Sequence, residues 1–190
     1  MKAHSIKVCL FSLFLCVFNH SIAIAKTGSN HLTAHKSQSK IDIDGKGNDT
    51  SWQLATWQPI NNLILGVMPT KDDFSGQYKI LWDEHQLYLL VEITDDILFD
   101  QHSDPRYLYW DDDCLEVFLD EDASGGNHQF NHNAFAYHVA LDNQVVDIGE
   151  PLADGTDNFV LLNDHIHSSW RRHERSPNKI TWELAIRIYD

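Results

Sequence analysis

The sequence has few cysteines, few basic residues and no apolar segment long enough to cross a bilayer. Two of its three cysteines, Cys9 and Cys16, lie near the N-terminus, and the remainder of the chain holds only Cys114. No internal disulfide is therefore expected in that remainder. Acidic side chains outnumber basic ones by 28 to 14, and the formal net charge is −14. Such a charge disfavours nucleic acid and anionic membrane surfaces, and it favours neutral ligands or bound cations.

Residues 1–25 have the features of a secretory signal peptide. Two lysines precede an apolar run of about 11 residues, too short to span a bilayer. A small-residue cleavage site follows at Ala23-Ile24-Ala25. We therefore predict cleavage after Ala25, a secreted or periplasmic protein and no membrane insertion. Residues 26–40 are polar and predict a flexible linker, and residues 41–190 are long enough for one domain with its own core.

The remaining sequence indicates strands, with no pattern of a long amphipathic helix. Short β-rich runs recur at regular spacing, separated by turn residues such as Asp142-Asn143 and Asp154-Gly155. We expect a short alternating strand at Ile41–Gly45, one helical turn within 51–57, and then strands at 77–82, 87–93, 115–119, 134–141, 144–148, 159–162, 166–172 and 180–188. This order predicts an all-β fold, an antiparallel β-sandwich or jelly roll.

The segment from Trp110 to Asp120 is the most informative part of the chain. A tryptophan is followed by three aspartates and then by a strand with a carboxylate in its middle. With a period of two, the strand has two faces: Leu115, Val117 and Leu119 on one, Cys114, Glu116 and Phe118 on the other. A carboxylate is costly to bury without a partner, so Glu116 either faces solvent or has a specific role. An aromatic plane beside such an acceptor suits a sugar, which has apolar C–H faces and hydroxyl edges.

Catalysis by paired carboxylates is the weaker interpretation of this segment. Asp113 and Glu116 are three residues apart and point to opposite faces of a regular strand, so they cannot converge on one glycosidic bond. Neither Gly-x-Ser-x-Gly nor His-Glu-x-x-His occurs. A structural role for Glu116 stays open, either as the partner of an arginine such as Arg106 or as a calcium ligand. Trp110 has a second interpretation too, as an edge residue.

Four groups of residues occur in a fixed order along the chain. They are Ile43-Asp44-Gly45 with Trp52 and Ala55; Leu81-Trp82-Asp83 with Leu87-Tyr88 and Thr94-Asp95; Trp110 with Asp113, Leu115, Glu116, Phe118 and Asp120; and Trp182-Glu183-Leu184-Ala185-Ile186. Together they resemble the family 9 carbohydrate-binding modules, a group of DOMON-like sandwiches, over residues 41–188. The resemblance implies a non-catalytic sugar-binding protein that carries structural calcium and supports a glycoside hydrolase.

The resemblance also implies the site residues. Trp110 matches one aromatic wall of the sugar site and Glu116 a hydroxyl acceptor, while His138 takes the position of the family's arginine. The second aromatic wall belongs to a segment beyond the last strand, and the sequence stops at Asp190. Either the last strands are missing or the clamp is one-sided, and we expect an affinity on the order of micromolar to millimolar. Calcium is expected at carboxylates that end strands, namely Asp95, Asp96 and Asp120.

Several other aromatic and sulfur-containing residues have structural interpretations. Trp52, Trp82 and Trp182 are predicted to anchor the core, and Cys114 to fill space at the base of the site. His138 shares its strand face with alanines and has a structural interpretation beside the ligand-binding one. A b-type haem-binding electron-transfer module is the alternative function, with Met68 and His138 as axial ligands. An accessory domain of a glycoside hydrolase is a second alternative.

Overall fold

The computed structural model describes residues 32–123 and 134–188. The chain divides into residues 1–32, of which only Leu32 is described, and residues 33–190, which contain all the described strands. The predicted signal peptide, 1–25, therefore lies outside the described residues. Within the described ranges, no helix is long and apolar enough to cross a membrane.

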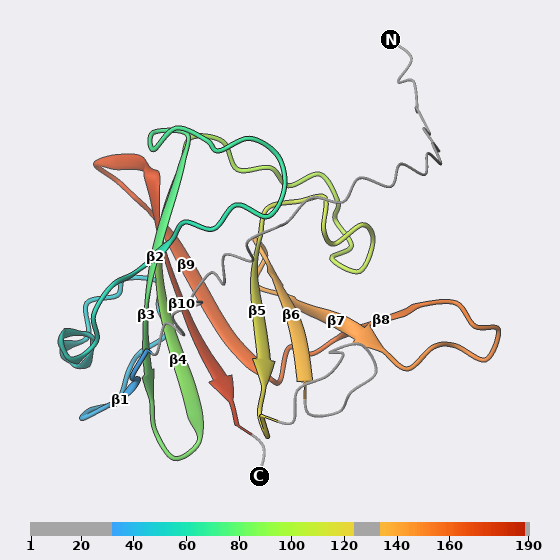
Figure 1. Cartoon of the computed structure of the whole chain (residues 1–190), viewed down its shortest axis with the longest axis horizontal. Helices are drawn as coiled ribbons and strands as arrows, with labels where there is room; N and C mark the ends of the chain where they lie inside the picture. Colours follow the sequence, from blue (N-terminus) through green and yellow to red (C-terminus); the bar gives the residue numbers. More distant parts are fainter. Residues whose placement is uncertain (1–31, 124–133, 189–190) are drawn as a thin grey trace, which may run out of the picture. The chain divides into compact units, whose positions relative to one another are not determined.

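Two sheets form the fold, and Figure 1 shows them as two layers. Their strands are β1 (His35–Lys36), β2 (Gln58–Ile60), β3 (Phe74–Trp82), β4 (Gln86–Asp95), β5 (Cys114–Asp120), β6 (Ala134–Ala140), β7 (Val145–Gly149), β8 (Asn158–Leu161), β9 (Ile166–His173) and β10 (Ser176–Arg187). The first sheet has the order β1-β3-β4-β10-β9 with β2 beside β3, and the second has the order β5-β6-β7-β8. Every described pairing except that of β1 with β3 is antiparallel. The predicted antiparallel β-sandwich is confirmed.

The strands predicted between residues 77 and 188 are present as β3 to β10, with shifted ends. The expected helical turn is a 3₁₀ turn, η1 (Thr50–Leu54). The sequence pattern missed β1 and β2, because edge strands of two or three residues are too short to show a period. β1 lies inside the predicted linker, 26–40, where it pairs with β3 in parallel. Strand pairing in the described part of the chain therefore starts at His35, inside the predicted linker.

Both faces of the first sheet are covered by apolar side chains. Val91 of β4 and Trp182 of β10 face the second sheet and form the core between the layers. On the opposite face, Leu90 packs under the segment that carries Ile41 and Trp52. A strand buried on both faces has no polar alternation, and this explains the continuous apolar run of β4.

The segment Ile41–Gly45 covers the first sheet without joining it, so the strand predicted there is wrong. Glu183 of β10, which is fully buried, explains the difference. Its carboxylate accepts the backbone N–H groups of Asp44 at 3.2 Å and Gly45 at 2.9 Å, and the indole N–H of Trp52 at 3.1 Å. The carboxylate thus accepts the hydrogen bonds that these backbone N–H groups would otherwise donate to a neighbouring strand.

Two of the three tryptophans predicted to anchor the core do so. Trp52 and Trp182 are each 2% exposed, whereas Trp82 is 38% exposed. Trp82 is the last residue of β3 and lies beside the short β1. Its indole N–H donates to the carbonyl of Ala34 at 3.1 Å, and the Lys36 ammonium lies 5.7 Å from its ring centroid. The prediction for Trp82 was wrong because it was based on residue type, whereas the position of Trp82 at the end of β3 leaves its side chain partly exposed.

Candidate functional site

The two faces of β5 are those that the alternation predicts. Leu115, Val117 and Leu119 pack against the core between the sheets. On the other face, Phe118 is 62% exposed and the side chain of Glu116 is 42% exposed. Glu116 therefore lies on the outer face of the second sheet, within reach of solvent.

Glu116 and His138 form a cross-strand pair. They are directly opposite each other in the register of β5 and β6, and Oε1 of Glu116 lies 3.0 Å from Nε2 of His138. The other ring nitrogen, Nδ1, lies 3.0 Å from the carbonyl oxygen of Ala136. The predicted alternative partner, Arg106, pairs instead with Asp104 at 3.0 Å. The carboxylate thus has a basic partner, and that partner is the histidine of the neighbouring strand.

Both ring nitrogens of His138 lie at hydrogen-bonding distance from oxygen atoms. A carbonyl oxygen can only accept a hydrogen bond, so Nδ1 carries a hydrogen. Nε2 then faces the Glu116 carboxylate, and either a hydrogen shared by these two groups or a metal ion bound by both fits between them.

Tyr109 joins this pair to the exposed tryptophan. Its ring centroid lies 4.3 Å from that of His138, 4.9 Å from that of Trp110 and 4.9 Å from that of Phe159 on β8. Trp110 is 58% exposed and lies 6.5 Å from Phe159. The outer face of the second sheet therefore carries a cluster of aromatic rings beside the Glu116–His138 pair.

Tyr109 and Phe159 are site residues that sequence reasoning missed. Tyr109 immediately precedes Trp110, and this adjacency was the signal that could have found it. Phe159 could not have been found in this way, because its place depends on the register of β8 against β7. Registers between strands are set by turns and packing that single-sequence periodicity does not reveal.

The aspartates after Trp110 hold the preceding loop in place. Asp112 accepts the backbone N–H groups of Gln101 and His102, each at 2.8 Å, and Asp113 accepts the N–H of Phe99 at 2.6 Å. Burial opposes ionisation of Asp112, but these backbone hydrogen bonds outweigh it and hold its pKa below the usual range. Because Asp113 accepts a hydrogen bond from the loop backbone, it does not form an acid–base pair with Glu116.

Cys114 lies at the base of the same face, partly buried. Burial, together with the negative charges of Glu116, Asp113 and Asp112, raises the pKa of its thiol to about 12. A cavity of about 190 Å³ lies beside it, with Tyr109 and Cys114 among its lining residues. This partial burial agrees with the prediction that Cys114 fills space at the base of the site. Cys114 also lies near Glu116 and His138.

The aspartates predicted to bind calcium do not all lie together. Burial and the charges of Asp113 and Asp96 raise the pKa of Asp95 at the end of β4, and the charge of Arg172 opposes this shift. Asp120 ends β5, seven residues after Asp113, or about 23 Å along an extended strand. Asp95 and Asp120 therefore cannot ligate one ion, and calcium at either place stays a prediction.

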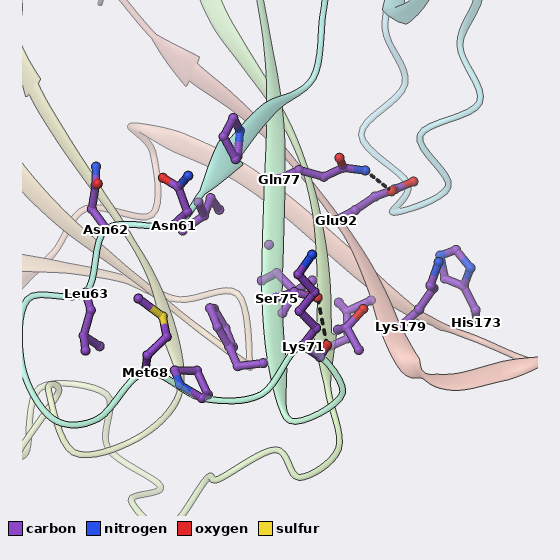
Figure 2. A pocket seen from close by; sticks show the side chains of 18 residues that line it. Asn61, Asn62, Leu63, Met68, Lys71, Ser75, Gln77, Glu92, His173 and Lys179 are labelled. Carbon is purple, nitrogen blue, oxygen red and sulfur yellow. Dashed lines mark hydrogen bonds between the residues drawn. The ribbon is translucent and has the colours of Figure 1, made fainter.

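A larger cavity, of about 730 Å³, lies on the first sheet beside the loop 61–73. Figure 2 shows Leu63 and Met68 on the loop, with Gln77 and Glu92 on the adjacent strands. Gln77 donates to Glu92 at 2.8 Å, so these two polar side chains already bond each other. None of the predicted sugar-binding residues lines this cavity.

Met68 and His138 are not brought together. Met68 lines the cavity of the first sheet, whereas the ring of His138 contacts Tyr109 and Glu116 on the outer face of the second. The axial pair required by the haem alternative is therefore not formed by these residues.

The fold defines a class of protein, the small antiparallel β-sandwich modules. Residues 43–189 match the family described as carbohydrate family 9 binding domain-like, and the chain belongs to that family. The family is one of carbohydrate-binding modules, which agrees with the non-catalytic interpretation of β5.

Solved structures share the fold. A family 9 carbohydrate-binding module from Caldicellulosiruptor kristjanssonii in complex with cellotriose is 19% identical, with a TM-score of 0.58, over 83% of this chain and 68% of that one. The same kind of module from that organism in complex with glucose gives a TM-score of 0.59 at 19% identity, over 82% and 69% of the two chains. At this identity the likeness establishes the fold.

Curated relatives are much longer enzymes. Endo-1,4-beta-xylanase A of Thermotoga neapolitana is 30% identical over 79 residues, which are 42% of this chain and 7% of that protein. Endo-1,4-beta-xylanase C of Paenibacillus barcinonensis is 28% identical over 109 residues, 57% of this chain and 9% of that protein. The matched region thus spans less than a tenth of either xylanase.

Proposed function

We propose that the chain binds a mono- or oligosaccharide reversibly on the outer face of its second sheet, without chemistry of its own. The observation that carries this proposal is the half-exposed Trp110 beside the Glu116–His138 pair. The indole offers a plane for the C–H face of a sugar ring. The carboxylate accepts hydroxyl hydrogens, and His138 holds it in place. Membership of a carbohydrate-binding family supports the same proposal.

The affinity should be weak. One indole and one carboxylate–imidazole pair supply few anchors, and association costs several kcal/mol of lost translational and rotational freedom. Histidine also offers fewer donors than the guanidinium of the family pattern, and it cannot grip two hydroxyls as a fork. We expect dissociation constants on the order of micromolar to millimolar.

Isothermal titration calorimetry with glucose, cellobiose and xylo-oligosaccharides tests this function. Trp110→Ala should abolish the heat of binding or weaken affinity by about tenfold or more, because it removes the stacking plane. Trp82→Ala is the matched control, since it removes an exposed indole from the first sheet. Absence of heat with every sugar, or equal losses in both variants, would show that the proposed site is wrong.

We also propose that the protein is exported and works beside a glycoside hydrolase. The leader-like residues 1–25 support export, and the xylanase relatives support the hydrolase partnership. If export occurs with cleavage after Ala25, the N-terminal sequence of protein recovered from the periplasm or medium begins at Lys26. Full-length chain recovered only from the cytoplasm would contradict this.

Structural calcium belongs to the same proposal. It is proposed at the predicted residues Asp95 and Asp96: the charges of Asp113 and Asp96 raise the pKa of Asp95, whereas Arg172 lowers it, so this end of β4 carries excess negative charge. Chelation should then lower the melting temperature of the protein, and added calcium should restore it. The control is magnesium, which is smaller and demands near-ideal octahedral geometry. An unchanged melting temperature after chelation would remove the claim.

A further inference from the structure

We infer that Cys114, Glu116 and His138 form a binding site for a divalent cation of the zinc class. The three side chains share the outer face of the second sheet: Cys114 and Glu116 are two residues apart on β5, and His138 is opposite Glu116 on β6. They offer one sulfur, one oxygen and one nitrogen ligand, the donor set that Zn²⁺ takes in proteins. The site differs from the predicted calcium aspartates in both residues and chemistry.

The distances fit such an ion. One ligand atom from each of the three residues lies within 4.8 Å of the other two, and Nε2 of His138 is 3.0 Å from Oε1 of Glu116. Tetrahedral zinc with ordinary bond lengths needs about 3.3 Å between nitrogen and oxygen, and about 3.5 Å between sulfur and nitrogen. The carboxylate–imidazole spacing is therefore close to the required value, and the Cys114 sulfur lies within 4.8 Å of both groups.

The histidine is already oriented as a metal ligand. Its Nδ1 donates to the carbonyl of Ala136 at 3.0 Å, which fixes the ring and directs Nε2 toward Glu116. A metal-bound histidine typically makes this kind of second hydrogen bond to a backbone carbonyl or carboxylate. Nε2 lies 3.0 Å from Oε1 of Glu116, so a metal ion between the two groups would be bound by both.

Binding conserves charge and involves no redox change. The thiol of Cys114 releases its proton to solvent, as does any protonated Nε2 of His138, and the ion forms bonds to S⁻, N and O⁻ in their place. A thiolate and a carboxylate then balance the two positive charges of the metal. The sulfur donor disfavours calcium and magnesium, which prefer oxygen ligands.

The site is open on one side. The Glu116 side chain is 42% exposed, so solvent reaches the carboxylate. Three protein ligands leave a fourth tetrahedral position for water or for an oxygen of a ligand, an arrangement typical of exchangeable zinc sites. The same two residues, Glu116 and His138, are proposed to hold sugar. Bound zinc occupies their lone pairs and should weaken sugar binding.

Cobalt substitution tests the site directly. In a chain with Cys9→Ser and Cys16→Ser, Cys114 is the sole thiol, so a sulfur-to-cobalt charge-transfer band can come only from it. We expect one Co²⁺ per chain with this band, displaced by Zn²⁺. Cys114→Ser should abolish the band, and Glu116→Gln and His138→Gln should each weaken Zn²⁺ affinity by about tenfold or more.

His167→Gln is the matched control, because it removes an exposed histidine from β9 and should leave Zn²⁺ affinity unchanged. A missing charge-transfer band, or a Zn²⁺ affinity that is the same in all variants, overturns the inference. Circular dichroism checks that Cys114→Ser is folded; should it not fold, the comparison of Glu116→Gln with His167→Gln decides. Trp110→Ala separates the two sites, since it should reduce sugar binding and keep the cobalt band.

Discussion

The indole N–H of Trp52 donates to Oε1 of Glu183 at 3.1 Å, although 131 residues separate them. The second oxygen of the same carboxylate accepts the N–H of Gly45 at 2.9 Å. The first and last of the four motifs are therefore parts of one structural contact. A fully buried carboxylate is tolerated here because three N–H donors surround it, two from the backbone and one from the indole.

Glu183→Ala should lower the free energy of unfolding by about 3 kcal/mol, because it leaves buried N–H donors without an acceptor. Trp52→Phe replaces the buried indole by a smaller ring, so it loses one hydrogen bond and leaves a cavity, and it should cost about 2 to 3 kcal/mol. Urea denaturation followed by circular dichroism measures both. Glu84→Ala, which removes an exposed carboxylate, should leave stability almost unchanged. Equal costs at positions 84 and 183 would contradict the role assigned to Glu183.

Much of the fold could be predicted because burial leaves a period in the sequence. The alternation of β5 correctly placed Leu115 inside and Glu116 outside, and the continuous apolar run of β4 correctly indicated a strand covered on both faces. The same signal was misleading at Ile41–Gly45, because an extended segment held by a side chain alternates just as a strand does.

The site was less predictable, because it depends on register and loop docking. Glu116 and His138 were both singled out, but nothing in the sequence showed that β5 and β6 pair them directly. The position of Tyr109 depends on a loop that Asp112 and Asp113 hold through backbone N–H groups. The sequence analysis did not foresee that these two carboxylates accept hydrogen bonds from the loop backbone.

Asp83 should make the β3–β4 turn sensitive to acid. Its carboxylate accepts the N–H groups of His85 at 2.8 Å and Gln86 at 2.9 Å, and the hydroxyl of Tyr88 at 2.7 Å. Burial raises the pKa of Asp83, but these hydrogen bonds outweigh it and bring the pKa below the ordinary 3.8. The Asp83 carboxylate therefore binds a proton more readily in the unfolded state than in the folded state. Its contribution to the free energy of unfolding is complete above the pKa of the unfolded state and is lost as the pH falls through the pKa of the folded state.

Asp83→Asn should therefore destabilise the protein by about 1 to 2 kcal/mol at neutral pH, and the difference from wild type should shrink below about pH 4. Urea denaturation across that range measures it. Asp42→Asn, at an exposed carboxylate, should have an effect below about 0.5 kcal/mol at neutral pH. A difference at position 83 that grows on acidification would contradict the assigned sign.

Tyr109 should act on sugar binding through its neighbours. It packs between His138 and Trp110, with ring centroids at 4.3 Å and 4.9 Å. Tyr109→Ala removes the support of both, and we expect the dissociation constant for sugar to rise by about threefold to tenfold. Tyr109→Phe keeps the ring and should bind as wild type does. Calorimetry compares the two, and a loss in the phenylalanine variant would instead indicate a direct contact through the hydroxyl.

Gly45 and Gly66 offer a matched test of how the N-terminal segment docks on the first sheet. Both have positive φ, +76° and +87°, so alanine at either position pays the strain of a left-handed conformation. A Cβ at Gly45 would also lie 2.8 Å from the backbone carbon of Trp170, whereas nothing lies within 4 Å of one at Gly66. The difference in stability between Gly45→Ala and Gly66→Ala therefore measures the cost of disturbing the close packing of the N-terminal segment against β9.

Gly66→Ala should cost about 1 kcal/mol, the strain alone. Gly45→Ala should cost at least about 2 kcal/mol more, because backbone at Trp170 cannot yield as a flexible side chain can, and because movement of residue 45 stretches its hydrogen bond to Glu183. Urea denaturation gives both values. In Gly45→Ala the loss should overlap with that of Glu183→Ala, so that the double variant is less destabilised than the two single losses added together. Simple additivity would mean that Gly45 and Glu183 stabilise the fold independently, against the shared contact described above.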